Sequence, residues 1–167
     1  MRPALLTLRK LDAELLRALR TRGHVPRVEQ AIVGYSRLGE HSRIWFGVAA
    51  MGALGHGDGR AVYLRALRTL VAAELVAAAL KRVVRRARPR LDRLPALATV
   101  PSDLSYPSAH AVTSFAAARV LTGVLPPTPL YCAALVMAGT RPYLGVHYPS
   151  DVIAGVLLGV ALAELVP

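Results

Sequence analysis

The sequence is poor in cysteine, in aromatic side chains and in acidic residues, and each shortage excludes something. The single cysteine, Cys132, excludes an intrachain disulfide and a zinc site built on cysteines. Because aromatics are only 5%, the 54% of hydrophobic residues are mainly Ala, Leu and Val, which suits helices packed through small residues. The 10 acidic residues face 21 Lys and Arg, so the net charge of +11 favours an anionic partner: phospholipid, nucleic acid or a phosphorylated substrate.

Long uninterrupted apolar runs are also scarce, although the mean hydropathy of +0.41 is high. Apolar segments lie at roughly residues 43–56, 61–80, 108–125, 129–141 and 151–166, and most fall short of the ~20 residues that cross a bilayer comfortably. We expect an all-α fold, an integral membrane helical bundle of about five to six short helices. A chain of 167 residues allows one domain over 1–167, with the bundle at 43–166, and the proline-rich residues 87–107 predict one long loop.

The N-terminal region has a helical leucine pattern. In a helix over residues 4–21, one face would carry Leu5, Leu8, Leu11, Leu15 and Leu19. This pattern predicts an amphipathic helix within 1–22 that lies in the membrane interface; a soluble bundle helix would look similar, but the apolar remainder of the chain favours the interface. The region has no apolar core followed by a cleavage site, so we expect no signal peptide. Whether residues 22–42 span, dip or lie flat stays open.

The predicted segments place most of the positive charge at one end of the bundle. If they alternate in direction, the end of 61–80, the start of 108–125, the end of 129–141 and the start of 151–166 meet at one membrane face. Most Lys and Arg lie at that face, and the exceptions are Arg60, Arg65, Arg68 and Arg119. By the positive-inside rule this face is cytoplasmic, which predicts a multi-pass plasma-membrane protein with its polar site on the cytoplasmic side.

Three separated pieces of sequence converge at this face. They are Lys81 with Arg88-Pro89, then Pro107-Ser108-Ala109-His110, then Arg141 with His147 and Asp151. Paired Arg donors and a Lys charge suit the oxygens of a phosphate ester, and the backbone N–H groups and dipole at a helix start near Ser108 suit the same anion. His147, with Asp151 four residues on, suits a nucleophile; His110 suits a general acid and base.

Plainer readings of the same residues compete with this one. A lone histidine is usually structural, and a basic run beside an apolar helix usually anchors it to a membrane. Two histidines and one carboxylate could also suggest a metal site, but three cationic side chains beside them would repel a metal ion. The three pieces together favour a phosphate site without metal or other cofactor.

The spacing of these pieces resembles the three-part signature of the type 2 phosphatidic acid phosphatase superfamily, at 81–89, 107–110 and 140–151. Two positions differ from the usual pattern: Ala109 replaces a Gly between Ser and His, and Thr140 replaces a Ser before Arg141. The resemblance implies that His147 attacks phosphorus to form a phosphohistidine, that Asp151 orients it, and that His110 protonates the leaving group and then activates water. It also implies phosphate ligands, namely Lys81, Arg88, Ser108, Ala109 and Arg141. The other basic residues of 82–90, including Arg86, are then expected at lipid headgroups.

The wider sequence is similar to actinobacterial phosphatases linked to decaprenylphosphoryl-5-phosphoribose. This implies a lipid-borne substrate, a prenyl-phosphoribose 5-phosphate on the way to the arabinose donor of the cell wall. Phosphatidylglycerophosphate, phosphatidate and undecaprenyl or other polyprenyl pyrophosphate remain alternative substrates. A vanadate-dependent haloperoxidase and a basic lipid-binding membrane scaffold remain alternatives from other classes. Nucleic acid is not expected as a partner, because no recognition motif accompanies the charge. The sequence predicts contact with membrane phospholipids and leaves the oligomeric state open.

Overall fold

The computed structural model describes residues 3–167, with side chains from Thr7 onward, and this part of the chain is helical. Its elements are α1 (Pro3–Thr21), α2 (Pro26–Leu38), a 3₁₀ turn (Glu40–Ser42), α3 (Arg43–Leu54), α4 (Arg60–Val84), α5 (Ala109–Leu121), α6 (Pro127–Tyr143) and α7 (Pro149–Leu165). Within residues 3–167 there is no β-strand, and isolated bridges join Ala87 to Leu104 and Leu91 to Leu94 in the long loop. The all-α expectation is confirmed.

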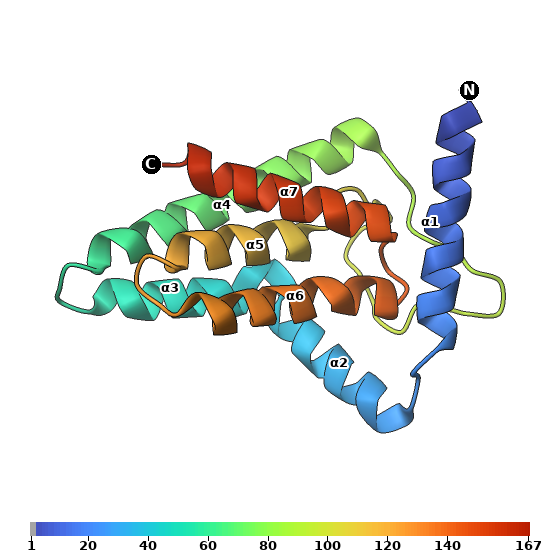
Figure 1. Cartoon of the computed structure of the whole chain (residues 1–167), viewed down its shortest axis with the longest axis horizontal. Helices are drawn as coiled ribbons and strands as arrows, with labels where there is room; N and C mark the ends of the chain where they lie inside the picture. Colours follow the sequence, from blue (N-terminus) through green and yellow to red (C-terminus); the bar gives the residue numbers. More distant parts are fainter. Residues whose placement is uncertain (1–2) are drawn as a thin grey trace.

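The helices α3 to α7 lie lengthwise beside one another, and α1 stands across one end (Figure 1). The end of α4, the start of α5, the end of α6 and the start of α7 gather at the end near α1 (Figure 1). This is the alternating arrangement expected from the apolar segments. It brings the three separated pieces of sequence to one end of the bundle.

The helix α5 is the centre of the bundle, since nearly all of its side chains are buried. It packs most extensively on α7, and then on α4 and α6. Two glycines of α7 permit the close approach: a Cβ at Gly155 would lie 2.8 Å from the Ser108 carbonyl, and one at Gly159 would lie 2.3 Å from the Val112 carbonyl. The contact fixes the start of α5 against α7, which matters because both carry residues of the predicted site.

Helix boundaries follow local chemistry closely. Proline occupies the first turn of α6 and of α7, where its missing N–H costs nothing. The helix α5 ends at Leu121, earlier than the expected 125, because residues 122–125 turn toward the prolines that start α6. The helix α2 and the 3₁₀ turn occupy the region 22–42 that the sequence left open.

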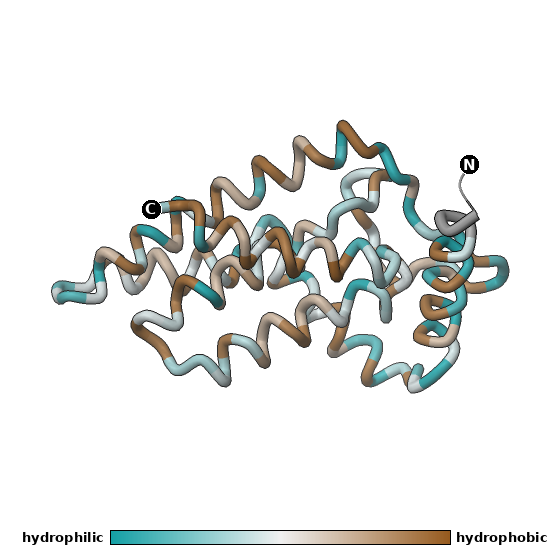
Figure 2. Tube along the Cα trace, turned by 45° about the horizontal axis from the view of Figure 1, so that its top comes forward, coloured by the Kyte–Doolittle hydropathy of each residue, from teal (hydrophilic) through white to brown (hydrophobic). Residues whose placement is uncertain are grey.

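The outward surface of the bundle carries many large apolar side chains. Hydrophobic residues run along α3 to α7, and hydrophilic ones concentrate at the turns and near α1 (Figure 2). The exposed ones include Met51, Leu54, Leu75, Leu135, Ile153 and Leu157. Judged by length and apolar character together, none of the helices in residues 3–167 qualifies as a membrane span.

The leucine face of α1 points away from the bundle. Leu8, Leu11, Leu15 and Leu19 are exposed by 64%, 49%, 56% and 43%, while the side chain of Leu5 lies outside the described part. The opposite face docks on the bundle through buried Asp12, Leu16 and Arg20. The predicted amphipathic helix is therefore present, and the face with Asp12, Leu16 and Arg20, not the leucine face, makes the intramolecular contact.

Candidate active site

The predicted site residues surround one cavity of about 480 Å³ at the α1 end of the bundle. Those that line it are Lys81, Arg88, Ala109, His110, Arg141 and His147. Ser108 and Asp151 are fully buried directly behind this lining. The fold thus joins residues from α4, the long loop, α5, α6 and α7 around a space large enough for a small phosphorylated group.

A short turn between α6 and α7 presents His147. Gly145 adopts a left-handed φ of +75°, which favours glycine, and the chain then re-enters a helix at Pro149. Asp151 and Tyr148 form a capping box at the start of α7, in which Asp151 Oδ2 accepts from the Tyr148 N–H at 2.9 Å. The same carboxylate oxygen lies 3.6 Å from His147 Nδ1, an ion-pair distance slightly beyond a hydrogen bond.

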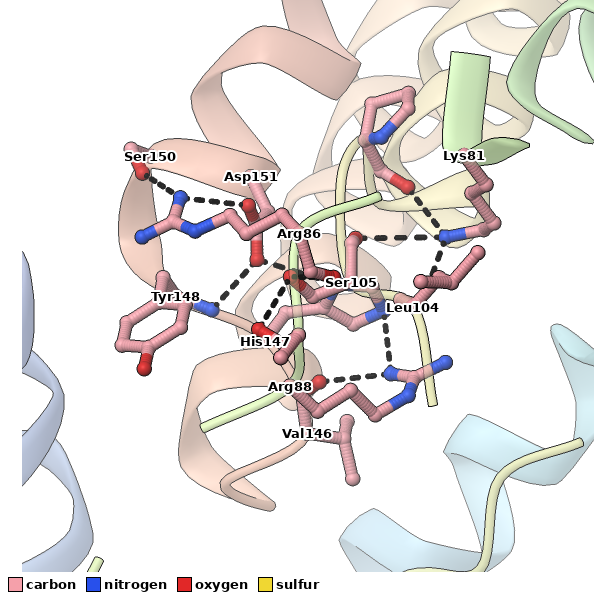
Figure 3. A network of polar contacts seen from close by, with 12 residues as sticks. Lys81, Arg86, Arg88, Leu104, Ser105, Val146, His147, Tyr148, Ser150 and Asp151 are labelled. Carbon is pink, nitrogen blue, oxygen red and sulfur yellow. Dashed lines mark hydrogen bonds and ion pairs between the residues drawn. The ribbon is translucent and has the colours of Figure 1, made fainter. Parts of the chain in front are cut away.

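The other ring nitrogen of His147 is held by a cation. Arg88 Nη1 donates to His147 Nε2 at 3.1 Å and to the Val146 carbonyl at 2.7 Å (Figure 3). Because Nε2 accepts this bond, the ring carries its proton on Nδ1, toward Asp151. Burial lowers the pKa of His147 to about 3, with neighbouring cations such as Arg88 adding to the effect and Asp151 opposing it. The imidazole is therefore neutral near pH 7, with a lone pair on Nε2.

The three cations of the cavity are held largely by uncharged groups. Lys81 Nζ donates to the Pro107 carbonyl at 2.7 Å, and Arg88 Nε donates to the Ser102 carbonyl at 2.6 Å. Arg141 Nη1 donates to the hydroxyl of Ser36 in α2. Since carbonyls and hydroxyls carry no full charge, the cavity keeps a net positive charge that suits an anion.

Two buried polar atoms point to the same conclusion. Within residues 3–167, four buried side-chain atoms have no hydrogen-bond partner, namely Arg20 Nε, Ser108 Oγ, Arg141 Nε and His147 Nδ1. Ser108 Oγ and Arg141 Nε belong to two of the predicted phosphate ligands. Ser108 is also the N-cap of α5, where the first backbone N–H groups of the helix are available to an acceptor. Unpaired buried donors are costly, at about 1–3 kcal/mol each, unless a ligand completes them. Phosphate oxygens would supply the missing acceptors.

His110 shares the cavity with His147 but is held differently. Its Nε2 donates to the Ser36 carbonyl at 3.3 Å, whereas His147 faces the carboxylate of Asp151. The segment 36–41, which includes Ser36, Gly39 and His41, forms the wall on this side of the cavity. The two histidines therefore have distinct surroundings, as two distinct chemical roles require.

Sequence reasoning missed several residues around the site. Ser36 contacts both Arg141 and His110, and Glu40 and Glu74 line the cavity. Glu74 Oε1 also accepts from the Ser42 hydroxyl at 2.6 Å. Ser36 and Glu40 lie in the region 22–42, for which the sequence did not decide between a spanning and an interfacial segment. Glu74, two turns before Lys81 on α4, could have been found from helical periodicity.

The expectation for Arg86 was wrong. Arg82, Arg85 and Arg90 are exposed, as headgroup contacts should be, but Arg86 pairs with Asp151 at 2.8 Å and with Asp12 at 2.7 Å. The basic run gave no sign of this difference, because the turn after α4 decides which guanidinium points inward. Figure 3 shows Arg86 beside Asp151, Ser150 and Tyr148.

Comparison with known proteins identifies the class. Residues 62–167, more than half of the chain, match the PAP2 superfamily, and the chain belongs to that superfamily. The curated relatives of this chain are named as phosphatases, and this chain is a phosphatase.

Two curated relatives are similar over most of the chain. A Mycobacterium tuberculosis protein named decaprenylphosphoryl-5-phosphoribose phosphatase is 41% identical over 134 residues, covering 80% of this chain and 75% of that protein. A Mycolicibacterium smegmatis protein of the same name is 43% identical over 123 residues, covering 72% of this chain and 67% of that protein. The resemblance drawn from the sequence is confirmed.

Two crystal structures share the fold. The transmembrane PAP2-type phosphatidylglycerolphosphate phosphatase of Bacillus subtilis has a TM-score of 0.80 and 24% identity, covering 95% of this chain and 84% of its own. Aquifex aeolicus LpxE has a TM-score of 0.79 and 22% identity, covering 91% of this chain and 92% of its own. At these identities the likeness concerns the arrangement of helices.

Proposed function

We propose that this chain is a membrane-bound phosphatase that hydrolyses a prenyl-phosphoribose 5-phosphate through a phosphohistidine intermediate. The observation that carries the reaction is the neutral His147 Nε2 in a cavity with three cations. The substrate class is supported by the relatives at 41% and 43% identity, which are named for decaprenylphosphoryl-5-phosphoribose. The two lines of support are independent, since one concerns the phosphoryl group and the other the carrier.

In the first step His147 Nε2 attacks phosphorus, and the bond from phosphorus to the ester oxygen breaks. Arg88 must shift its hydrogen bond from Nε2 to a phosphoryl oxygen, which frees the lone pair for attack. As the ring becomes positive, the carboxylate of Asp151 stabilises the proton on Nδ1. The product is a phosphohistidine in the cavity that Lys81, Arg88 and Arg141 line.

His110 takes the acid and base roles. Its protonated ring gives a proton to the departing ester oxygen, and it then accepts a proton from the water that attacks the phosphohistidine. Burial and the nearby Arg141 lower the pKa of His110 to about 2, so its ring is neutral in the empty site. The ring takes up this proton from water as the dianionic phosphate binds, because an opposite charge nearby stabilises an imidazolium. Inorganic phosphate leaves, and both histidines return to their starting states.

The remaining site residues hold the phosphoryl oxygens. Lys81, Arg88 and Arg141 supply charge, and the buried Ser108 hydroxyl and the N–H groups at the start of α5 supply further donors. None of these roles uses a metal ion, so turnover in the presence of EDTA is expected.

Two acidic side chains of the cavity favour a leaving group with hydroxyls. Glu40 and Glu74 line the same cavity as the three cations. Carboxylates accept hydrogen bonds from the hydroxyls of a sugar, and they repel a second phosphate group. A sugar phosphate on a lipid therefore fits the cavity better than a lipid pyrophosphate.

The membrane assignment rests on the outer surface. Large apolar side chains point outward from α3, α4, α6 and α7, and the leucine face of α1 is exposed beside the site. Exposed apolar area of this extent is typical of contact with lipid or protein. We place α1 in the interface and the cavity at the cytoplasmic face, where most of the Lys and Arg lie.

The first test is phosphate release by the detergent-solubilised protein with EDTA present. The panel contains a prenyl-phosphoribose 5-phosphate, a polyprenyl pyrophosphate, phosphatidate and phosphatidylglycerophosphate, each with His147→Ala as control. We expect fastest turnover of the phosphoribose lipid, and none in the variant. Faster turnover of another member would reassign the substrate, whereas lipid binding without turnover of any member would indicate a scaffold.

A further inference from the structure

A buried charge cluster lies behind the cavity and joins α1 to the active site. Arg86 Nη1 donates to Asp151 Oδ1 at 2.8 Å, and Arg86 Nη2 donates to Asp12 Oδ2 at 2.7 Å. The side chains of Asp12, Arg86 and Asp151 are exposed by 8%, 25% and 0%. Neither Asp12 nor Arg86 is among the residues of the described chain that line the cavity.

The guanidinium of Arg86 is fixed from several sides. Its Nη1 also donates to Ser150 Oγ at 2.7 Å, and its central carbon lies 4.0 Å from the centre of the Tyr148 ring. Asp12 Oδ1 accepts from the Ser150 N–H at 2.9 Å, so α1 also caps the start of α7. These contacts are more than a mobile surface arginine would make.

The cluster fixes the orientation of the Asp151 carboxylate. Its Oδ1 is held by Arg86, and its Oδ2 accepts from the Tyr148 N–H at 2.9 Å and faces His147 Nδ1 at 3.6 Å. Two holds on a carboxylate set its rotation, so Oδ2 stays directed at the imidazole. With Arg86 removed, a fully buried carboxylate would lose its charged partner and could turn or take up a proton.

Sharing of Arg86 between two carboxylates also matters for charge. If Arg86 paired with Asp151 alone, its positive charge would cancel the negative charge of Asp151. That negative charge is needed to stabilise the imidazolium of His147. Because Asp12 takes the other half of the guanidinium, the three groups together keep one net negative charge. The arrangement can therefore hold Asp151 in place and still stabilise an imidazolium.

We propose that Arg86 and Asp12 are positioning residues that act on His147 through Asp151, and that docking of α1 is thereby needed for full turnover. The inference rests on the proposed function, in which His147 is the nucleophile. It assigns to the N-terminal amphipathic helix a part in the chemistry besides any contact with lipid.

The test compares four variants in the full chain in detergent. They are Arg86→Ala, Arg86→Lys and Asp12→Asn, with Arg82→Ala as the matched control, since Arg82 is exposed and lies one turn earlier. Steady-state kcat and KM are measured on the best member of the lipid panel. The rate of phosphoenzyme formation is measured in a single turnover with labelled substrate, as label that becomes bound to the protein and is released by acid.

Arg86→Ala should lower kcat and the rate of phosphoenzyme formation by about 10–100-fold, the usual cost of losing a group that orients a reacting residue, with KM within about twofold. Arg86→Lys should recover part of the loss, because an ammonium can reach only one carboxylate at a time. Asp12→Asn should show a smaller loss in kcat, and Arg82→Ala should match the parent.

Unchanged kcat in Arg86→Ala, or a rise in KM alone, would overturn the inference. If Arg86→Ala does not fold, an unaltered kcat in both Asp12→Asn and Arg86→Lys would overturn it equally. Failure of the proposed function can be told apart from failure of this inference, because in the first case the parent enzyme itself would form no phosphohistidine. If the phosphoenzyme forms equally fast in the parent and in the Arg86 variants, the inference about Arg86 is wrong and the proposed function still stands.

Discussion

Arg65 and Arg60 at one end of the bundle and Arg141 at the other use their guanidinium groups in different ways. At the end away from α1, Arg65 donates to the Ala163 and Val166 carbonyls at 2.6 and 2.9 Å, and Arg60 donates to the Ala53 carbonyl at 3.1 Å. These bonds satisfy the last carbonyls of α7 and α3. At the α1 end, Arg141 is 4% exposed and its Nε has no partner within residues 3–167.

The difference separates stability from function. Arginines that cap helix ends complete hydrogen bonds which the fold would otherwise leave open. A buried arginine with an unused donor costs stability, and such a cost is typical of a site that awaits an anion. Variants at the two ends should therefore change different measured quantities.

The largest expected difference concerns histidine. His110→Gln should lower kcat by roughly 10²–10⁴ if His110 supplies the proton to the leaving group. His56→Gln, at the exposed turn between α3 and α4, should leave kcat unchanged. Phosphate release under saturating substrate measures both. Equal activity of the two variants would remove His110 from the reaction.

Two variants, one at each end of the bundle, test the comparison between Arg141 and Arg65. Ser36→Ala removes the hydroxyl that accepts from Arg141 and should lower kcat/KM about tenfold, the value of one charged hydrogen bond, with little change in stability. Arg65→Ala should lower the free energy of unfolding by about 1–3 kcal/mol and leave kcat/KM unchanged. Activity assays and thermal unfolding in detergent are run on both. A loss of activity in Arg65→Ala without a loss of stability would contradict the separation.

A last prediction concerns the pH dependence of stability. Burial lowers the pKa of His147 to about 3, against about 6.5 in an unfolded chain, so only the unfolded state binds this proton between those values. The stability contributed by the neutral ring is complete above pH 6.5 and is lost as the pH falls toward 3. His147→Asn should flatten this part of the unfolding curve, and His56→Gln should not. Identical curves for the parent and His147→Asn would show that His147 is not buried as a neutral ring.

Much of the active site could be predicted from the chain alone. The spacing from Lys81 to Arg88 and from His147 to Asp151, together with the order of the apolar segments, placed these residues at one end of a helical bundle. The helix starts at Ser108 and Pro149 followed from local capping chemistry. These predictions depend on periodicity and on short-range contacts, which a sequence displays directly.

The residues that were missed depend on contacts between distant segments. Ser36 reaches Arg141 across 105 positions, and Asp12 reaches Ser150 across 138. Nothing in the basic run of residues 81–90 distinguishes Arg86 from its exposed neighbours, and nothing in α1 marks Asp12 as buried. Only the docking of α1 beside the start of α7 decides both.

The amino-acid sequence by itself determined the helical segments, the class of phosphatase and most of the polar residues that gather at the cavity, because helix periodicity and motif spacing are local properties. The tertiary structure decided which face of α1 packs inward, which arginine pairs with Asp151, and which serine holds Arg141. Those outcomes depend on how whole helices pack. The most extensive helix contact, α7 on α5, is allowed by the absence of a Cβ at Gly155 and Gly159.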